Sequence, residues 1–119
     1  ELKKFGKAEA RFFEEVTVMF TDFRGFTQIA EKLTPAELVE EIDVCFKEFD
    51  SIISKYGIEK IKTIGDSYMA AAGLPVANPN HAFEMVMAAM DIIEYMKRHK
   101  KEREGKGKPV FEVRVGIHT

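Results

Sequence analysis

The chain has 119 residues, a length typical of one domain, and its 45% hydrophobic and 32% charged residues are typical of a globular protein. Its net charge of −2 gives no general attraction to nucleic acid or to an anionic membrane. A single cysteine excludes an intrachain disulfide, and no apolar run reaches the roughly 18 residues of a transmembrane helix. We therefore expect a cytoplasmic domain, or one on the cytoplasmic side of a membrane-anchored protein.

The N-terminal residues 1–13 place a few apolar side chains among lysines and glutamates, which is compatible with a short helix or a linker from an upstream domain. Residues 15–22 are rich in β-branched and aromatic side chains and are apolar on both faces, which predicts a central strand ending at Asp22. Gly25 follows and begins a short helix. We therefore expect the folded domain to cover residues 14–119.

A strong helix start follows at Thr34, Pro35 and Glu37, because threonine and glutamate can form a capping box and proline suits the first helical position. The predicted helix covers residues 35–55 and ends before Gly57. It carries one apolar stripe, made of Leu38, Val39, Ile42, Cys45, Phe46, Phe49, Ile52 and Ile53. Cys45 lies on that stripe, so we expect it to fill the core rather than to react.

The second half of the chain predicts a hairpin of residues 58–63 and 67–73 around a turn that contains Asp66. A second long helix is expected at 81–97, then a charged, solvated loop at 97–108 and a last strand at 110–117. The side chains expected to face inward from the second helix are Ala82, Met85, Val86, Ala89, Ile93 and Met96.

This order, βα(α)ββαβ, predicts an α+β ferredoxin-like sandwich with sheet order 4-1-3-2 and its helices on one face. The C-terminal end of strand 1 then meets the N-terminal start of strand 3, so Asp22 and Asp66 converge. Each alone is compatible with a capping or turn residue. Together they repel each other unless a cation lies between them, and hard oxygen ligands suit Mg²⁺ or Mn²⁺.

A phosphate site is expected beside these carboxylates, because Gly25, Phe26 and Thr27 open a helix with free backbone N–H groups. Carboxylates for metal next to amides for phosphate indicate a site for a metal–nucleotide complex. Lys62 and Arg114 are expected to project onto the sheet face that carries no helices, where a strand lysine is often only a solubilising residue.

Three blocks of sequence together resemble the class III adenylyl/guanylyl cyclase catalytic domain. They are residues 20–27 (FTDFRGFT), 59–75 (EKIKTIGDSYMAAAGLP) and 113–119 (VRVGIHT), in the family's order and spacing. The family converts a nucleoside triphosphate into a 3′,5′-cyclic monophosphate and pyrophosphate, using two Mg²⁺ or Mn²⁺ ions per site.

The resemblance assigns roles to individual residues. It implies that Asp22 and Asp66 are the catalytic metal-binding aspartates and that Phe23 gives a backbone ligand. The turn of Gly25, Phe26 and Thr27 would hold the triphosphate. Arg114 falls where some members of the family place a phosphate contact.

The position that distinguishes adenine from guanine in this family falls on Lys62. A lysine can donate to the acceptor N1 of adenine, whereas guanine presents an N1–H that needs an acceptor. The resemblance therefore implies an adenylyl cyclase acting on ATP, formed as a homodimer with composite active sites and carrying an upstream regulatory domain.

The family domain continues beyond the position of Thr119, so we expect this chain to be incomplete at its C-terminus and inactive by itself. The alternatives are a guanylyl cyclase and a catalytically silent cyclase-homology module that only dimerises or signals. An RNA-binding ferredoxin-like domain is disfavoured, because the net charge is negative and the open sheet face lacks paired aromatics.

Overall fold

The computed structural model describes residues 15–119, so the predicted N-terminal linker lies outside the described residues. The elements follow the predicted order. They are β1 (Thr17–Arg24), α2 (Phe26–Lys32), α3 (Pro35–Lys55), β2 (Glu59–Ile64), β3 (Ser67–Ala72), α4 (His81–Gly105) and β4 (Glu112–His118).

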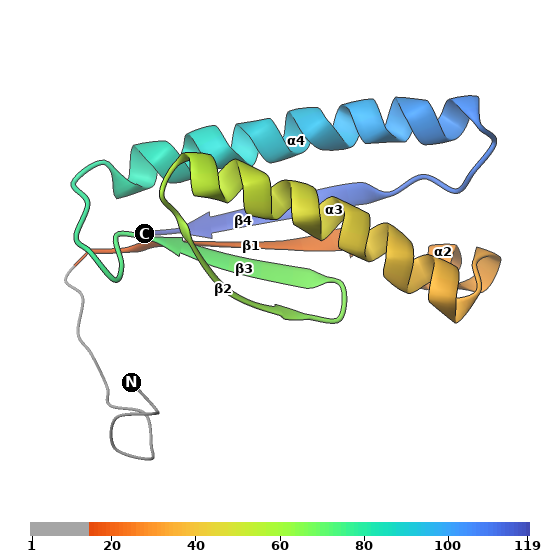
Figure 1. Cartoon of the computed structure of the whole chain (residues 1–119), viewed down its shortest axis with the longest axis horizontal. Coiled ribbons are helices and arrows are strands. Elements are labelled where there is room, and N and C mark those ends of the chain that lie inside the picture. Colours follow the sequence, from red (N-terminus) through yellow and green to blue (C-terminus); the bar gives the residue numbers. More distant parts are fainter. Residues whose placement is uncertain (1–14) are drawn as a thin grey trace, which may run out of the picture.

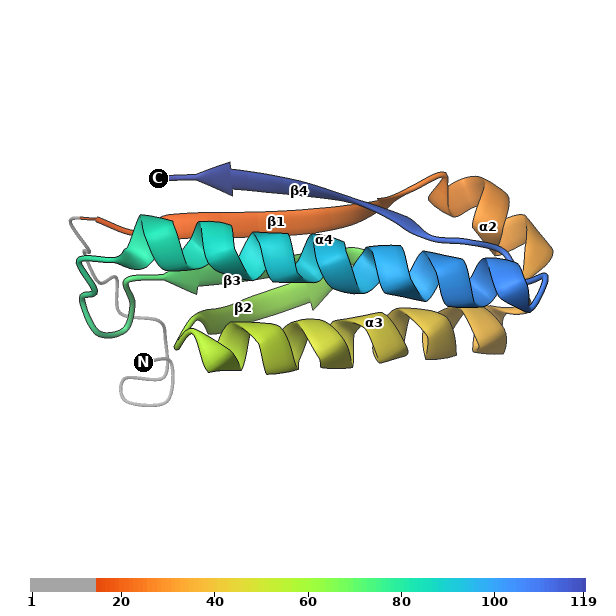
Figure 2. The same cartoon turned by 90° about the horizontal axis from the view of Figure 1, so that it is seen from above.

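The four strands form one sheet in the order β2-β3-β1-β4, and each neighbouring pair is antiparallel. α3 and α4 lie side by side over one face of this sheet, and the other face is free of helices (Figure 1, Figure 2). The prediction of an α+β ferredoxin-like sandwich, with its 4-1-3-2 strand order, is confirmed.

The core lies between the sheet and the two long helices. Along β1 the buried side chains are the alternate residues Thr17, Met19, Thr21 and Phe23, since successive side chains of a strand point to opposite faces. Phe23 stacks near Phe46 of α3, with ring centroids 6.1 Å apart. The intervening residues of β1, including Asp22, therefore belong to the face without helices, which we call the open face.

α3 begins and ends where the sequence predicts. The amide of Glu37 donates to Thr34 Oγ1 at 3.2 Å, and the amide of Thr34 donates to Glu37 Oε1 at 2.9 Å, which completes the capping box. Cys45 is fully buried, as expected of a core residue, and its burial raises the pKa of the thiol to about 11. Val39 was expected to lie in the apolar stripe, but its side chain is exposed.

α4 is longer than predicted, because the charged segment expected to be a loop remains helical as far as Gly105. Lysine, arginine and glutamate are good helix formers, so a high charge density does not by itself end a helix. The last turns are also anchored by the buried Arg103. Its guanidinium pairs with Glu41 of α3 and donates to the carbonyl of Pro109.

The inward face of α4 is only partly as predicted. Met85, Ala89 and Met96 are buried, but Ala82, Val86 and Ile93 are exposed, and Ala88 and Ile92 are buried in their place. The first half of α4 carries apolar side chains around much of its circumference. The helical period alone therefore permits more than one buried face, and packing against the sheet selects one.

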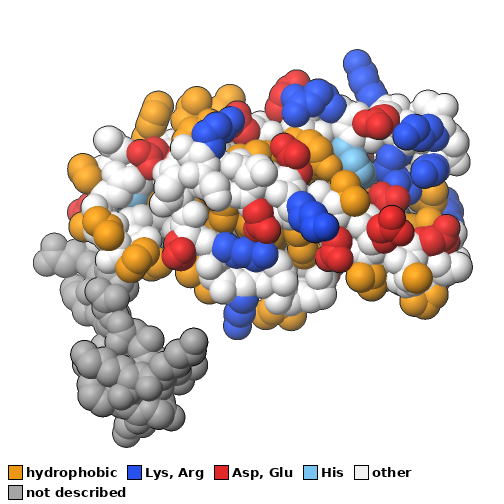
Figure 3. Space-filling view, in the orientation of Figure 1, with side chains coloured by type: hydrophobic (Ala, Val, Ile, Leu, Met, Phe, Trp, Pro, Cys, Tyr) orange, Lys and Arg blue, Asp and Glu red, His pale blue; other side chains and the backbone are white. Residues whose placement is uncertain are grey.

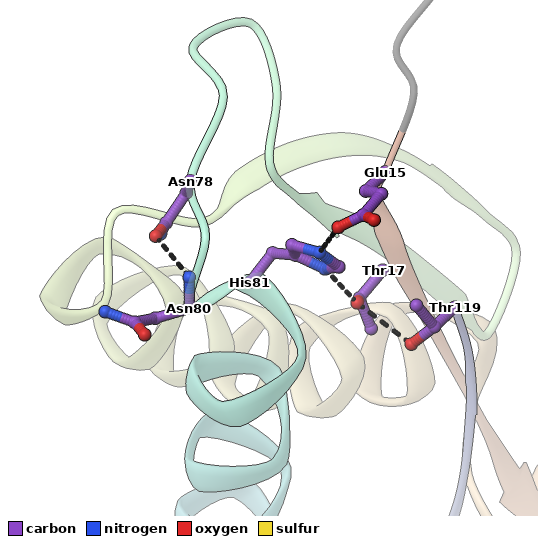
Figure 4. Close-up of polar contacts among 6 residues, drawn as sticks. All are labelled: Glu15, Thr17, Asn78, Asn80, His81 and Thr119. Atoms are coloured by element: carbon purple, nitrogen blue, oxygen red, sulfur yellow. Dashed lines mark hydrogen bonds and ion pairs between the residues drawn. The ribbon is translucent and has the colours of Figure 1, made fainter.

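A polar cluster joins the beginning of α4 to the start of β1 and to Thr119 after β4, at one end of the sheet (Figure 4). The buried His81 contacts Thr17 Oγ1 through Nδ1 at 2.7 Å, and Thr17 Oγ1 lies 3.1 Å from Thr119 Oγ1. His81 Nε2 lies 3.4 Å from a carboxylate oxygen of Glu15. The cluster thus satisfies a buried histidine and fixes where the chain enters β1.

Gly73 ends the small-residue strand β3 next to this cluster, and we expect Gly73→Ala to lower the free energy of unfolding by about 1–3 kcal/mol. Gly73 has a φ of 93°, and an added Cβ would lie 2.8 Å from the carbonyl oxygen of Glu15. Gly107→Ala is a matched control, because Gly107 also has a positive φ but has no atom within 4 Å of an added Cβ. Urea denaturation of both variants measures the difference; equal losses would contradict the close contact.

On the side of the molecule drawn in Figure 3, acidic and basic side chains are interspersed. No helix within residues 15–119 is long and apolar enough to cross a membrane. The residues that the sequence predicts for the site lie on the open face and at the end of the sheet that β1 reaches at Arg24.

Candidate active site at the end of the central strand

Two carboxylates meet at one end of the sheet. Asp22 lies near the end of β1, which continues two residues further than predicted, and Asp66 lies in the turn between β2 and β3. Figure 1 shows this turn at the same end of the sheet as α2. The amide of Phe23 donates to Asp66 Oδ2 across 3.4 Å, so the residue next to Asp22 contacts the second aspartate directly.

The donor set at this point fits a hard divalent cation. Asp22 and Asp66 provide carboxylate oxygens, and the main chain of Phe23 contacts the Asp66 carboxylate through its amide. Among residues 15–119 no group of three histidine, cysteine or acidic side chains is arranged to hold a metal ion. A metal here would therefore take two carboxylates together with main-chain, water or nucleotide oxygens, which is a coordination that Mg²⁺ and Mn²⁺ accept.

The Asp22 carboxylate is already paired with a cationic side chain. Arg114 of β4 lies directly opposite Asp22 in the sheet register, and its Nε and Nη2 donate to the two carboxylate oxygens at 2.8 and 3.0 Å. Hydrogen bonding to Asp22 raises the pKa of Arg114 above its usual value, and the charge of Asp66 adds to that effect. The sequence placed Arg114 on the open face but did not predict this pair.

The predicted phosphate turn lies immediately after β1. Gly25 has a φ of 66°, a left-handed conformation that turns the chain directly from Arg24 into α2. Phe26 and Thr27 form the first turn of α2, and Gly25 supplies no side chain to cap it. The backbone N–H groups of this turn are thus at the same end of the sheet as the carboxylates, which is the arrangement a bound triphosphate needs.

Lys62 lies on the exposed edge strand β2, and the register places it in one row with Met69 of β3 and Phe20 of β1. Asp22 belongs to the next row of the same open face. Two strand spacings, about 10 Å, separate Lys62 from β1. A register shift between Lys60 and Lys62 interrupts the regular pairing just before this lysine.

Phe20 is a feature of the open face that the sequence did not assign to the site. Half of its side chain is exposed, and its ring covers Gly116 of β4, where an added Cβ would lie 2.9 Å from the ring. Its alternation with Met19 and Thr21 was the available signal, because it places Phe20 on the same face as Asp22. On the open face Phe20 thus lies between Lys62 of β2 and Arg114 of β4.

Comparison with known proteins identifies the family. The protein family described as "Adenylate and Guanylate cyclase catalytic domain" matches residues 8–119, which is most of the chain. The chain belongs to this family. The cyclase domain is 40% identical over 119 residues to guanylyl cyclase C of Sus scrofa, covering 99% of this chain and 11% of that protein.

Solved structures agree with this assignment. A dimeric guanylyl cyclase domain of the RhoGC fusion protein from Blastocladiella emersonii has a TM-score of 0.82 and 31% identity, covering 91% of this chain and 58% of that chain. The adenylyl cyclase CyaB from P. aeruginosa has a TM-score of 0.78 and 31% identity, covering 86% and 54%. Both kinds of cyclase thus share the fold of this cyclase domain, which spans just over half of either structure.

Proposed function

We propose that this cyclase domain belongs to an adenylyl cyclase, which converts ATP into 3′,5′-cyclic AMP and pyrophosphate. The convergence of Asp22 and Asp66 at the end of β1 supports metal-dependent nucleotide chemistry. Lys62 is the residue that supports adenine, rather than guanine, as the base. Both features lie on or beside the open face. A nucleotide bound between two copies of this face would meet the phosphate-binding groups of one copy and Lys62 of the other.

In this proposal Asp22, Asp66 and the main-chain carbonyl of Phe23 hold two Mg²⁺ or Mn²⁺ ions. When bound, such ions assist loss of the ribose 3′-hydroxyl proton and neutralise the leaving pyrophosphate. The amides of Gly25, Phe26 and Thr27 orient the triphosphate, and Arg114 gives a further phosphate contact. The 3′-oxygen bonds to the α-phosphorus as the bond from the α-phosphorus to the bridging oxygen breaks, and pyrophosphate leaves.

Base selection in this proposal depends on hydrogen-bond polarity. The ammonium group of Lys62 is a donor only, and N1 of adenine is an acceptor, whereas N1 of guanine carries a hydrogen. The Lys62 side chain is exposed, so it is free to reach a base from the edge of the sheet. A lysine at this position therefore favours ATP over GTP.

The experiment is to replace Lys62 with glutamate in the full-length protein. We expect the ratio of kcat/KM for ATP to that for GTP to fall on the order of 10- to 100-fold, because a matched polar partner is replaced by a mismatched one. Lys47→Glu makes the same charge change at an exposed position on α3 and controls for charge alone. An unchanged ratio in Lys62→Glu would mean that Lys62 does not select the base.

Guanylyl cyclase activity is the second candidate, because a relative named as a guanylyl cyclase is 40% identical over 119 residues. Overall identity reports the shared fold and the shared metal chemistry, which both activities use. Base selection depends on a few side chains, so Lys62 weighs more than overall identity in our choice. The wild-type preference between ATP and GTP separates the two candidates.

A homodimer with composite sites is part of this proposal. The open face exposes Phe20 and Ile64, at 51% and 62% of their side chains, and apolar groups of this size on a sheet face favour association. The similar domain of the fungal RhoGC fusion protein is described as a non-canonical dimer, so cyclase domains of this fold do associate, although that dimer does not itself support composite sites. In such a dimer the metals lie on one copy and Lys62 of a second copy meets the base. An upstream regulatory domain and a cytoplasmic location complete the proposal.

A further inference from the structure

The pair formed by Arg114 and Asp22 occupies the carboxylate that the proposed metal site needs. Both oxygens of Asp22 accept hydrogen bonds from the guanidinium, at 2.8 and 3.0 Å. Each oxygen keeps a second lone pair, but a divalent ion bound there would lie close to the positive guanidinium and be repelled by it. The guanidinium and the metal ion are therefore competitors for the same ligand.

Exchange between the two cations faces little steric hindrance. The side chain of Arg114 is 65% exposed and that of Asp22 is 40% exposed, so the pair separates without opening the core. Exposed ion pairs are weak compared with carboxylate–metal bonds in a site with several ligands. The β1–β4 register nevertheless holds Arg114 opposite Asp22 after the pair breaks, so the guanidinium stays at the site.

The Arg114 guanidinium lies near two carboxylates, because Asp66 adds its negative charge to that of Asp22. Asp66 reaches the amide of Phe23 and adds its negative charge to the surroundings of Arg114. One positive side chain thus offsets part of the repulsion between two converging carboxylates, which is the task that a divalent ion would perform.

We propose that Arg114 acts as a displaceable counter-ion, which holds Asp22 in the metal-free cyclase domain and is exchanged for the divalent metal when the metal–nucleotide complex binds. This rests on the proposed function, since it requires a metal at Asp22. A free metal ion must break the pair of Arg114 and Asp22 without giving the released guanidinium a new hydrogen-bond partner. A metal–triphosphate complex offers the released guanidinium a phosphate oxygen, so it is favoured over the free ion.

The first test measures Mn²⁺ binding to the full-length protein without nucleotide, by electron paramagnetic resonance. We expect Arg114→Ala to bind Mn²⁺ roughly two- to fivefold more tightly than wild type, which corresponds to removal of an exposed ion pair. Arg24→Ala is the matched control, because Arg24 is exposed and on the same face of β1 but lies opposite Glu112 instead of Asp22. If Arg114→Ala binds Mn²⁺ no more tightly than Arg24→Ala, the proposed exchange of Arg114 for the metal ion is wrong.

The second test observes the exchange in the wild-type protein. The Nε–H signal of Arg114, identified by its absence in Arg114→Lys, is followed by NMR during addition of Mg²⁺. We expect this signal to shift in step with metal binding, because Nε loses its contact with Asp22. A signal that stays unchanged at saturating Mg²⁺ would mean that the ion pair and the metal coexist, and the inference would be wrong.

A third variant separates failure of this inference from failure of the proposed function. If Asp22→Asn binds Mn²⁺ as tightly as wild type, the metal is not at Asp22, and both the proposed metal site and the exchange are wrong. If Asp22→Asn loses Mn²⁺ binding while Arg114→Ala shows no gain over its control, the metal site stands and only the exchange is wrong.

Discussion

Replacing Asp22 with asparagine is expected to lower the turnover of the full-length protein by roughly a thousandfold or more at saturating Mn²⁺. The change removes the negative charge that holds the proposed metal ions, and metal stabilisation of developing charge contributes several kcal/mol to such reactions. The fold should survive, because Asp22 is on the open face and outside the core. The measurement is conversion of ATP to cyclic AMP, with thermal unfolding recorded for the same samples.

The matched control for this prediction is Asp43→Asn. Asp43 is an exposed aspartate of α3, on the helical side of the sheet, so its replacement removes the same charge away from the site. We expect it to keep wild-type turnover. Near-normal turnover of Asp22→Asn would contradict the metal assignment and would favour a capping or turn role for these carboxylates.

Replacing Arg103 with alanine is expected to lower the free energy of unfolding by about 3 kcal/mol, because it breaks a largely buried ion pair and leaves Glu41 without its partner. The side chains of Arg103 and Glu41 are only 7% and 23% exposed. The guanidinium also lies over the ring of Phe111, 5.0 Å from its centroid, so packing is lost together with charge.

Lys106→Ala is the control for that loss, because Lys106 pairs with Glu102 on the exposed surface of the same helical region, at 3.6 Å. Exposed pairs of this kind contribute about 0.3–0.5 kcal/mol. Urea denaturation of the two variants provides the comparison. If Arg103→Ala were no more destabilising than Lys106→Ala, the buried pair would have no anchoring role at the end of α4.

The elements with local signals were predictable from the sequence. α3 begins at Pro35 because Thr34 and Glu37 satisfy its first amides, and these residues are close together in the chain. The sheet order follows from element order and crossover handedness, which again requires no side-chain detail. The same sheet order predicts that the C-terminal end of β1 lies beside the start of β3, so Asp22 and Asp66 were expected to converge at one end of the sheet.

The features that depend on distant contacts were not predictable. Arg103 anchors α4 through Glu41 and Pro109, and nothing near residue 103 in the sequence distinguishes it from its solvated neighbours. The pair of Arg114 and Asp22 depends on the exact register of β1 against β4, and a slip of one residue would move Arg114 to the other face. The hydrophobic period of a helix or strand indicates which faces could be buried, and long-range packing determines which face is buried.

The measurement that tests the central claim most directly is a paired assay of the wild-type full-length protein with ATP and with GTP, at saturating Mn²⁺ and again after chelation by EDTA. We predict that 3′,5′-cyclic AMP forms with a higher kcat/KM than cyclic GMP and that chelation abolishes both products. A higher kcat/KM for GTP would contradict the role of Lys62, and product formation that persists in EDTA would contradict the metal site at Asp22 and Asp66.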